Sequence, residues 1–224
     1  MPMAKKISNQ KIALAEFLGS TILLMTIVGA GIMADIVSAD DGVSMFITVT
    51  SIAVSIGLII KIFGPISGGH FNPLVTLYFY YRKEVSAKTG FIMVLSQLSG
   101  ALLGTVLANL MFDLPAISIS KLDRLGTHIF VAELVSTIGL FIVLQLINSN
   151  KNLNPAIIIP IYIGPAIFYT SSTAFVNPSI TLTRTLSDTF TGISPASVPL
   201  FLLAQLLGAI IGVFISKGLI DSKK

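Results

Sequence analysis

Long apolar runs separated by short polar breaks dominate the chain, and they predict membrane-spanning helices. Asp, Glu, Lys and Arg are absent from four such runs, at residues 17–34, 43–60, 89–112 and 134–150. A helix needs roughly 20 mainly apolar residues to cross the hydrocarbon core of a bilayer. We therefore predict six spans, at about residues 12–33, 43–63, 89–111, 128–147, 153–170 and 197–216.

Two further apolar segments are too short to cross the membrane, and each contains an Asn-Pro pair. One is "SGGHFNPLVTLYFYY", after the second span, and the other is "TAFVNPSITLTRTL", after the fifth. Asn is a preferred helix N-cap and Pro suits the first helical position, so helices should begin at Pro73 and Pro178. A helix over residues 73–81 is ~13 Å long, about half of the ~30 Å hydrocarbon core. We predict two re-entrant half-helices, 73–81 and 178–187, whose N-termini meet at mid-membrane.

Three sequence markers occur twice in the same order, which indicates an internal repeat. "LAEFLGST" matches "VAELVSTI", "FNPLVTL" matches "VNPSITL", and "QLSGALLG" matches "QLLGAIIG". Each copy holds three spans, so the second copy must be inverted, as in channels and transporters with a path at the repeat interface. We predict an all-α membrane protein with a first repeat over 1–111, an extracellular linker over 112–127 and an inverted repeat over 128–224. A third Asn-Pro, Asn154-Pro155, is interpreted as the start of the fifth span.

Composition agrees with a membrane protein and limits its chemistry. Hydrophobic residues make up 54% of the 224 residues and the mean hydropathy is +0.91. Charged residues make up 11%, whereas a soluble domain has about 25%. The chain has no cysteine and two histidines, which excludes thiol chemistry and predicts neither a metal site nor a cofactor. The predicted pore centre has no nucleophile–base pair, so an intramembrane enzyme is not expected.

Basic residues concentrate on one side of the predicted topology. Because Lys and Arg favour the cytoplasmic side, both termini are predicted to be cytoplasmic, in the inner (plasma) membrane. The net charge of +4 is thereby explained by topology rather than by nucleic-acid binding. The residues assigned to the cytoplasmic side are Lys5, Lys6, Lys11, Lys61, Arg82, Lys83, Lys88, Lys151, Lys217, Lys223 and Lys224, against Lys121, Arg124 and Arg184 on the other side.

Asn72 and Asn177 mark the predicted centre of the pore. Each half-helix N-terminus carries about +0.5 elementary charge, which repels cations and hydronium. The two side chains can donate amide hydrogens to a passing solute, and irregular backbone at this depth is tolerated where it lines a watery cavity. Such a path suits small uncharged solutes and excludes ions. The residues expected to offer pore-lining carbonyls are Gly68, Gly69, His70, Phe71, Thr173, Phe175 and Val176.

These features resemble the aquaporin (major intrinsic protein) family. The boxes in "SGGHFNPLVTL" and "FVNPSITL", a Glu in the first and fourth spans, and the "QLSGALLG"/"QLLGAIIG" pair carry the resemblance, which covers nearly the whole chain. It implies a passive channel that assembles as a homotetramer with one pore per subunit. The family's boxes normally read Asn-Pro-Ala, whereas here Leu74 and Ser179 stand in the third position.

The resemblance also implies a selectivity filter outside the central asparagines. By family spacing its positions are Ile52, Pro165 (or Gly164), Ala174 and Ile180, and the last is usually an arginine. The stretch "STAFVNPSITLTRTLSDTF" is similar to bacterial aquaglyceroporins linked to arsenite, in which an aliphatic residue replaces that arginine. A wider, apolar filter implies glycerol-like polyols, water and neutral hydroxides such as arsenous acid as solutes.

Several polar residues leave two hypotheses open. Arg184 either acts as a displaced filter cation in the outer vestibule, or pairs with Asp188 or faces a neighbouring subunit. Glu16 and Glu133 either relay protons or hold the re-entrant loops, and their repeat symmetry favours loop support. His70 is interpreted as a hydrogen-bonded structural residue at the inner mouth rather than as a pH gate. The pairs Gly100/Gly104 and Gly208/Gly212 predict close helix crossings.

Two other functions remain as alternatives. One alternative is a water-selective pore, which conducts water but not glycerol, whereas a channel with a wider filter conducts both. A coupled secondary transporter also uses inverted repeats and broken helices. A transporter would need a charged residue where the half-helices meet, yet no Asp, Glu, Lys or Arg lies within residues 70–80 or 173–180.

Overall fold

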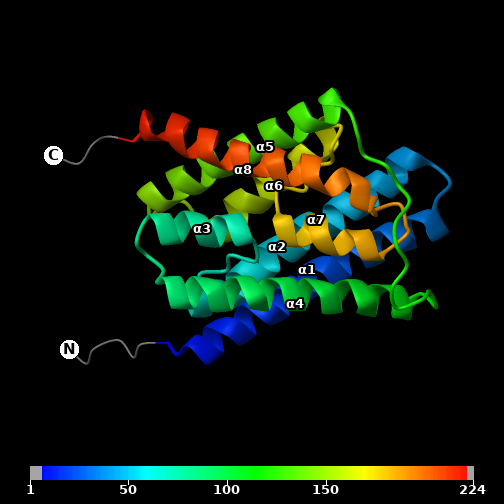
Figure 1. Ribbon diagram of the computed structural model, residues 1–224, viewed down its shortest axis with the longest axis horizontal. Coiled ribbons are helices and arrows are strands. Elements are labelled where there is room, and N and C mark those ends of the chain that lie inside the picture. Colours follow the sequence, from blue (N-terminus) through cyan, green and yellow to red (C-terminus); the bar gives the residue numbers. More distant parts are fainter. Residues whose placement is uncertain (1–6, 221–224) are drawn as a thin grey trace.

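Long helices surround two short ones in the computed structural model, which describes residues 7–220 (Figure 1). No strand is present within these residues, so the all-α prediction is confirmed. The elements are α1 (Asn9–Val37), α2 (Asp41–Ser67), α3 (Pro73–Tyr81), α4 (Ala87–Met111), α5 (Thr127–Ser149), α6 (Pro155–Tyr169), α7 (Pro178–Thr183), the 3₁₀ turns η1 (Arg184–Leu186) and η2 (Pro195–Ser197), and α8 (Val198–Lys217).

Five helices in the described part of the chain are long and apolar enough to cross a membrane, namely α1, α2, α4, α5 and η2 with α8. The fifth predicted span corresponds to α6, which is shorter at 15 residues and contains Pro160 and Pro165. It begins at the third Asn-Pro as predicted, because the Asn154 side chain accepts a hydrogen bond from the Ala156 amide at 3.0 Å. This Asn-Pro pair therefore caps a helix and does not lie at the pore.

The two repeats pack in equivalent ways, with α1 against α4 and α5 against α8. A Cβ atom at Gly100 would collide with the Phe17 carbonyl oxygen, and one at Gly212 would collide with the Ile138 carbonyl oxygen. Only glycine lets the two backbones approach this closely, which is the packing role predicted for the glycine pairs. The other members of the two pairs, Gly104 and Gly208, are enclosed in the same way.

Replacing Gly100 with alanine is therefore expected to lower the thermal unfolding midpoint of the detergent-solubilised protein. The added methyl group forces α1 and α4 apart, and overpacking of this kind costs about 1–3 kcal/mol. Gly64→Ala is the matched control, since the nearest atom to a Cβ there lies 3.9 Å away, at ordinary contact distance. Equal midpoints for the two variants would contradict the close-packing role.

The second half-helix is shorter than predicted. We expected helix over residues 178–187, whereas α7 ends at Thr183 and continues as the 3₁₀ turn η1 to Leu186. The reason is a tertiary contact: the Thr185 and Leu186 carbonyls accept hydrogen bonds from the Ser120 amide (2.8 Å) and the Ser118 amide (3.0 Å). Backbone carbonyls engaged by the linker are directed away from the helix axis, so the helix cannot continue.

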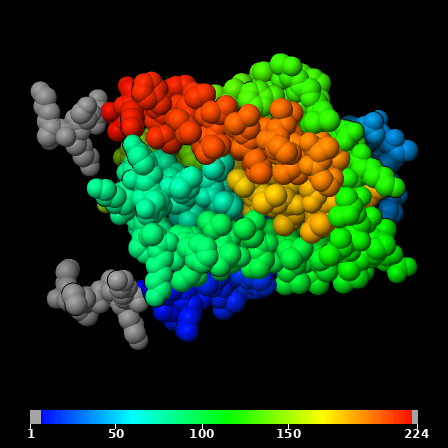
Figure 2. All heavy atoms as spheres, in the orientation of Figure 1, coloured from blue at the N-terminus to red at the C-terminus, as the bar shows by residue number. Residues whose placement is uncertain are grey.

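The half-helices α3 and α7 lie end to end through the middle of the bundle (Figure 1). The bounds of α3, Pro73–Tyr81, are those predicted for the first half-helix. In the space-filling view, α3 and α7 fill the strip between α4 and α8 (Figure 2). The linker, residues 112–126, crosses one end of the bundle beside α7. The first and last described segments both lie at the other end of the bundle, on opposite sides of it (Figure 1). Lys5, Lys6, Lys223 and Lys224, used for the topology prediction, lie outside the described residues.

Candidate solute pore

Glu16 anchors the loop that leads into α3. Its side chain is fully buried. One carboxylate oxygen accepts hydrogen bonds from the His70 amide (3.0 Å) and the Ser67 hydroxyl (2.5 Å). The other oxygen accepts from the Phe71 amide (2.8 Å) and from Gln97 Nε2 (2.7 Å). The carboxylate thus binds successive backbone amides just before the half-helix and fixes their direction.

Glu133 repeats this arrangement in the second half. It is also fully buried, and it accepts hydrogen bonds from the Phe175 amide (3.1 Å), the Val176 amide (2.6 Å) and Gln205 Nε2 (2.8 Å). Neither Glu16 nor Glu133 lies in the wall of the central cavity. These contacts favour loop support over a proton relay, since neither carboxylate faces the solute path.

The anchored loops have an unusual backbone conformation. Phe71, Thr173, Ala174 and Val176 have φ angles of 46°, 58°, 44° and 47°. Non-glycine residues rarely occupy this left-handed region, and each costs about 1–3 kcal/mol unless its surroundings enforce it. The carboxylate of Glu133 supplies part of this enforcement in the second loop, because it binds the Phe175 and Val176 amides.

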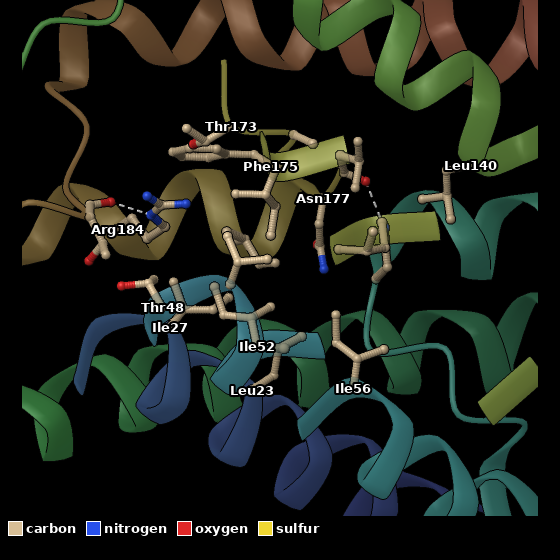
Figure 3. A pocket seen from close by; sticks show the side chains of 18 of the residues that line it. Leu23, Ile27, Thr48, Ile52, Ile56, Leu140, Thr173, Phe175, Asn177 and Arg184 are labelled. Atoms are coloured by element: carbon tan, nitrogen blue, oxygen red, sulfur yellow. Dashed lines mark hydrogen bonds between the residues drawn. The ribbon is translucent and has the colours of Figure 1, made fainter. Parts of the chain in front are cut away.

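The two box asparagines bind each other's loops. Asn72 Oδ1 accepts from the Leu74 amide (2.9 Å), which leaves Nδ2 to donate to the Val176 carbonyl at 2.8 Å. Asn177 Oδ1 accepts from the Ser179 amide (3.0 Å), and its Nδ2 donates to the Phe71 carbonyl at 2.8 Å. Each amide group has two hydrogens, so one per asparagine remains for a solute in the cavity that both side chains line (Figure 3).

A cavity of about 530 Å³ lies between the half-helix tips and α1, α2, α5 and α6 (Figure 3). Isoleucine is its commonest wall residue. Aspartate and arginine occur in the wall only at Asp123, Arg124 and Arg184, and no lysine or glutamate is among the described residues that line it. Of the residues predicted from the sequence, the wall includes Ile52, Gly69, His70, Phe71, Asn72, Thr173, Ala174, Phe175, Val176, Asn177, Ile180 and Arg184.

Two predicted pore residues are placed elsewhere, which corrects the prediction. Pro165 is exposed on the outer face of α6, in a shallow groove against α2, and Gly164 faces the same groove. The α6 residues that do line the cavity are Ile159, Ile163 and Ile167, which are spaced four residues apart and share one helix face. Gly68 also lies outside the wall, because it forms the C-cap of α2 with φ 94°. No sequence pattern distinguished Ile159, Ile163 and Ile167 from their neighbours, since α6 is apolar on all sides.

His70 is held by neighbouring side chains. Its Nδ1 lies 3.1 Å from the Thr76 hydroxyl, and its ring stacks on Phe79 with 4.6 Å between ring centroids. Because the Thr76 hydroxyl donates to the Asn72 carbonyl (3.2 Å), it is an acceptor for His70. This network favours the hydrogen-bonded structural interpretation of His70.

Arg184 points into the cavity and does not pair with Asp188. Its Nε donates to the Thr191 carbonyl, and its guanidinium carbon lies 3.6 Å from the centroid of the Phe175 ring (Figure 3). Asp188 instead accepts a hydrogen bond from the Lys121 amide at 2.9 Å. The contacts therefore favour a vestibule position for Arg184 over the pair with Asp188.

Arg124 is a wall residue that the sequence did not reveal. Its Nε donates to the Gly192 carbonyl (2.8 Å) and its Nη2 to the Phe190 carbonyl (3.1 Å), and it too lies over the Phe175 ring, at 5.4 Å. Burial lowers the pKa of Arg124 to about 10, so it stays protonated at neutral pH. As a lone arginine in a linker, it had no motif to distinguish it from a surface residue.

Residues 7–220 contain no group of three or more His, Cys, Asp or Glu residues that could hold a metal ion.

Opposed, asparagine-capped half-helices around a central cavity, in a bundle of apolar helices, define an integral membrane protein with a pore between two inverted repeats. The chain belongs to the major intrinsic protein family, whose sequence profile matches residues 3–171. The family resemblance seen in the sequence is thereby confirmed.

Relatives and a solved structure agree with this assignment. The chain is similar to Aquaglyceroporin AqpS of Rhizobium meliloti (strain 1021), at 36% identity over 208 residues that cover 92% of this chain and 89% of the relative. It is 27% identical over 150 residues to Glycerol uptake facilitator protein-like 6 of Lactiplantibacillus plantarum, covering 63% and 65% of the two chains. The structure of the aquaglyceroporin from Plasmodium falciparum matches with a TM-score of 0.71 and 19% identity over 96% of this chain and 97% of that one, which shows the fold.

Proposed function

We propose that this protein is a passive channel for small uncharged solutes, namely glycerol-like polyols, water and neutral hydroxides such as arsenous acid. As a member of the major intrinsic protein family it is a channel and not an enzyme. Two relatives described above are named as an aquaglyceroporin and a glycerol uptake facilitator, which supports glycerol as a solute. We further propose a homotetramer in the plasma membrane with both termini cytoplasmic.

The composition of the cavity wall is the observation that carries this proposal. Donors and acceptors occur at Asn72 and Asn177, whereas Ile52, Ile163 and Ile180 present hydrocarbon. A polyol has hydroxyl groups that can bond to the asparagines and carbon atoms that can pack on isoleucine. Water has no such apolar face, and a water molecule without partners loses about 1–3 kcal/mol per unmet group. The wall therefore suits polyols better than water alone.

We propose that Ile52, Ala174 and Ile180 contribute to the selectivity filter, with Ile163 and Ile167 from α6 in place of Pro165. All five line the cavity, and none carries a charge or a hydrogen-bonding side chain. Such a filter selects by size and by the solute's apolar surface rather than by a fixed cation. Ions are excluded by the cost of dehydration and by the positive half-helix N-termini.

Stopped-flow light scattering on proteoliposomes tests this function. Glycerol and urea fluxes are expected to exceed those of empty liposomes severalfold, and arsenous acid, which is neutral at pH 7, is expected to follow glycerol. Water flux without any solute flux would support the water-selective alternative instead. Solute flux that depends on an ion gradient would indicate a coupled transporter and would contradict the passive channel.

A further inference from the structure

Two arginine side chains meet over one aromatic ring at the linker end of the cavity, which we define by Leu122–Leu125. The guanidinium carbons of Arg184 and Arg124 lie 3.6 Å and 5.4 Å from the centroid of the Phe175 ring. The loop of residues 190–192 holds both groups through three successive carbonyls: Phe190 and Gly192 bind Arg124, and Thr191 binds Arg184. Both guanidinium groups are thus held by one loop, and both residues line the same cavity.

The terminal nitrogens of Arg184 have no protein partner. Its Nε donates to the Thr191 carbonyl, and Nη1 and Nη2 make no hydrogen bond to any residue in the described part of the chain. The side chain is only 6% exposed, and it lies in the cavity wall. A buried guanidinium with free donors is costly unless an acceptor reaches it from the cavity.

The arginines also lack a counter-ion. The one ion pair within residues 7–220 is Arg82–Glu84, at the opposite half-helix. Of the nearby carboxylates, Asp123 accepts from the Ser194 hydroxyl (2.5 Å), Asp188 accepts from the Lys121 amide, and Glu133 binds the loop amides behind Phe175. None forms an ion pair with Arg124 or Arg184, so the buried guanidinium of Arg184 and the half-buried one of Arg124 line the cavity without an ion-pair partner.

We infer that the linker end of the cavity is a binding site for a small monovalent oxyanion, held between Arg184 and Arg124, and that the bound anion blocks solute passage. Guanidinium groups bind carboxylates and related oxyanions through two parallel hydrogen bonds, and Arg184 offers such a pair of donors. The anion does not pass further through the cavity because the rest of the wall is mainly apolar, with Ile52 and Ile180 among its residues. An anion leaving the arginines for this surface would lose its partners without regaining water.

Methanesulfonate is a suitable probe, since it stays anionic and carries oxygen atoms that can bind a guanidinium. Glycerol flux into proteoliposomes is measured while methanesulfonate replaces chloride on both sides at constant ionic strength. We expect saturable inhibition with half-inhibition at about 1–10 mM, the range that two charge-assisted hydrogen bonds supply. This readout rests on the proposed channel function.

Single substitutions locate the site. Arg184→Gln and Arg124→Gln remove one guanidinium each and are expected to weaken inhibition by about tenfold or more, the effect of losing at least one charge-assisted bond. Arg184→Lys keeps the charge without the paired donors and should be intermediate. Arg82→Gln is the matched control, because Arg82 also lies over a tyrosine ring, Tyr78, but at the other half-helix. Inhibition equal to wild type in both Gln variants would overturn the location.

A second measurement does not depend on flux. A ligand that binds the folded state raises the thermal unfolding midpoint, so methanesulfonate should raise it relative to chloride in wild type and less in Arg124→Gln. Arg124 belongs to the linker, so this variant remains usable where Arg184→Gln does not fold. A midpoint shift without any glycerol flux would sustain the anion site and overturn the channel proposal. If glycerol flux occurs but methanesulfonate neither inhibits it nor shifts the unfolding midpoint, the proposed anion site is overturned. If methanesulfonate itself enters the proteoliposomes and carries current, the proposal that the bound anion blocks the pore is overturned.

Discussion

Replacing Glu133 with leucine is expected to abolish solute flux and to lower the unfolding midpoint more than any other single change discussed for this protein. The variant leaves three buried N–H groups without an acceptor: the amides of Phe175 and Val176, and one of the two Nε2 hydrogens of Gln205, whose other hydrogen bond goes to the Thr181 hydroxyl. Each unpaired buried donor costs about 1–3 kcal/mol, and the total approaches the 5–15 kcal/mol stability of a typical domain. The left-handed residue Val176 (φ 47°) also loses the carboxylate that binds its amide.

Monodispersity in detergent, the unfolding midpoint and glycerol flux together measure this effect. Glu133→Gln keeps one acceptor oxygen at nearly the same size, so it should retain part of the stability. Glu84→Gln is the control on an accessible glutamate: its ion pair with Arg82 is partly exposed, and such pairs contribute about 0–1 kcal/mol. A stable, conducting Glu133→Leu protein would show that the loop does not need this anchor.

Replacing Ile180 with arginine is expected to reduce glycerol flux by about tenfold or more, which corresponds to about 1.4 kcal/mol of added barrier. Ile180 is 8% exposed and lies in the cavity wall four residues before Arg184, so the new guanidinium would enter the cavity from the same side of α7. It would narrow the cavity and remove an apolar surface on which the carbon atoms of a polyol can pack. Water is smaller and needs only hydrogen-bonding partners, so water flux should fall much less.

The ratio of glycerol to water flux, measured by stopped-flow light scattering, checks this prediction. Ile180→Val serves as the control, since it removes one methylene and keeps the wall apolar. We expect it to leave the ratio close to that of wild type. A similar ratio for Ile180→Arg and wild type would show that residue 180 does not contribute to the filter.

Much of the fold could be predicted from local patterns. The apolar runs predicted the helices, and Asn72-Pro73 and Asn177-Pro178 predicted where α3 and α7 begin, because N-capping is a contact within one turn: each Asn side chain accepts from the amide two residues later. The length of α7 could not be predicted in this way. Its end depends on the Ser118 and Ser120 amides, which lie in a linker distant in sequence.

The candidate site divides in the same manner. The box asparagines and the two glutamates stood out because polar groups are rare in such a sequence and occur twice. The inward face of α6 did not stand out, because Pro165, Ile163 and their neighbours are all apolar, and only packing against α2 and α5 decides which face lines the cavity. The spacing typical of the family therefore pointed to Pro165, which lies on the outward face of α6.

The sequence by itself therefore determined the helices, the inverted repeat, the half-helix starts and the polar groups at the centre. All of these depend on interactions within a few residues or on the plain requirement that buried polar groups be rare and paired. The tertiary structure alone decided which isoleucines line the cavity, and that Arg124 joins Arg184 over Phe175 although the two are far apart in the chain. The physical reason is that both features require distant segments to pack against each other. Only this packing decides which helix face is turned to the cavity and brings the two arginines to one ring.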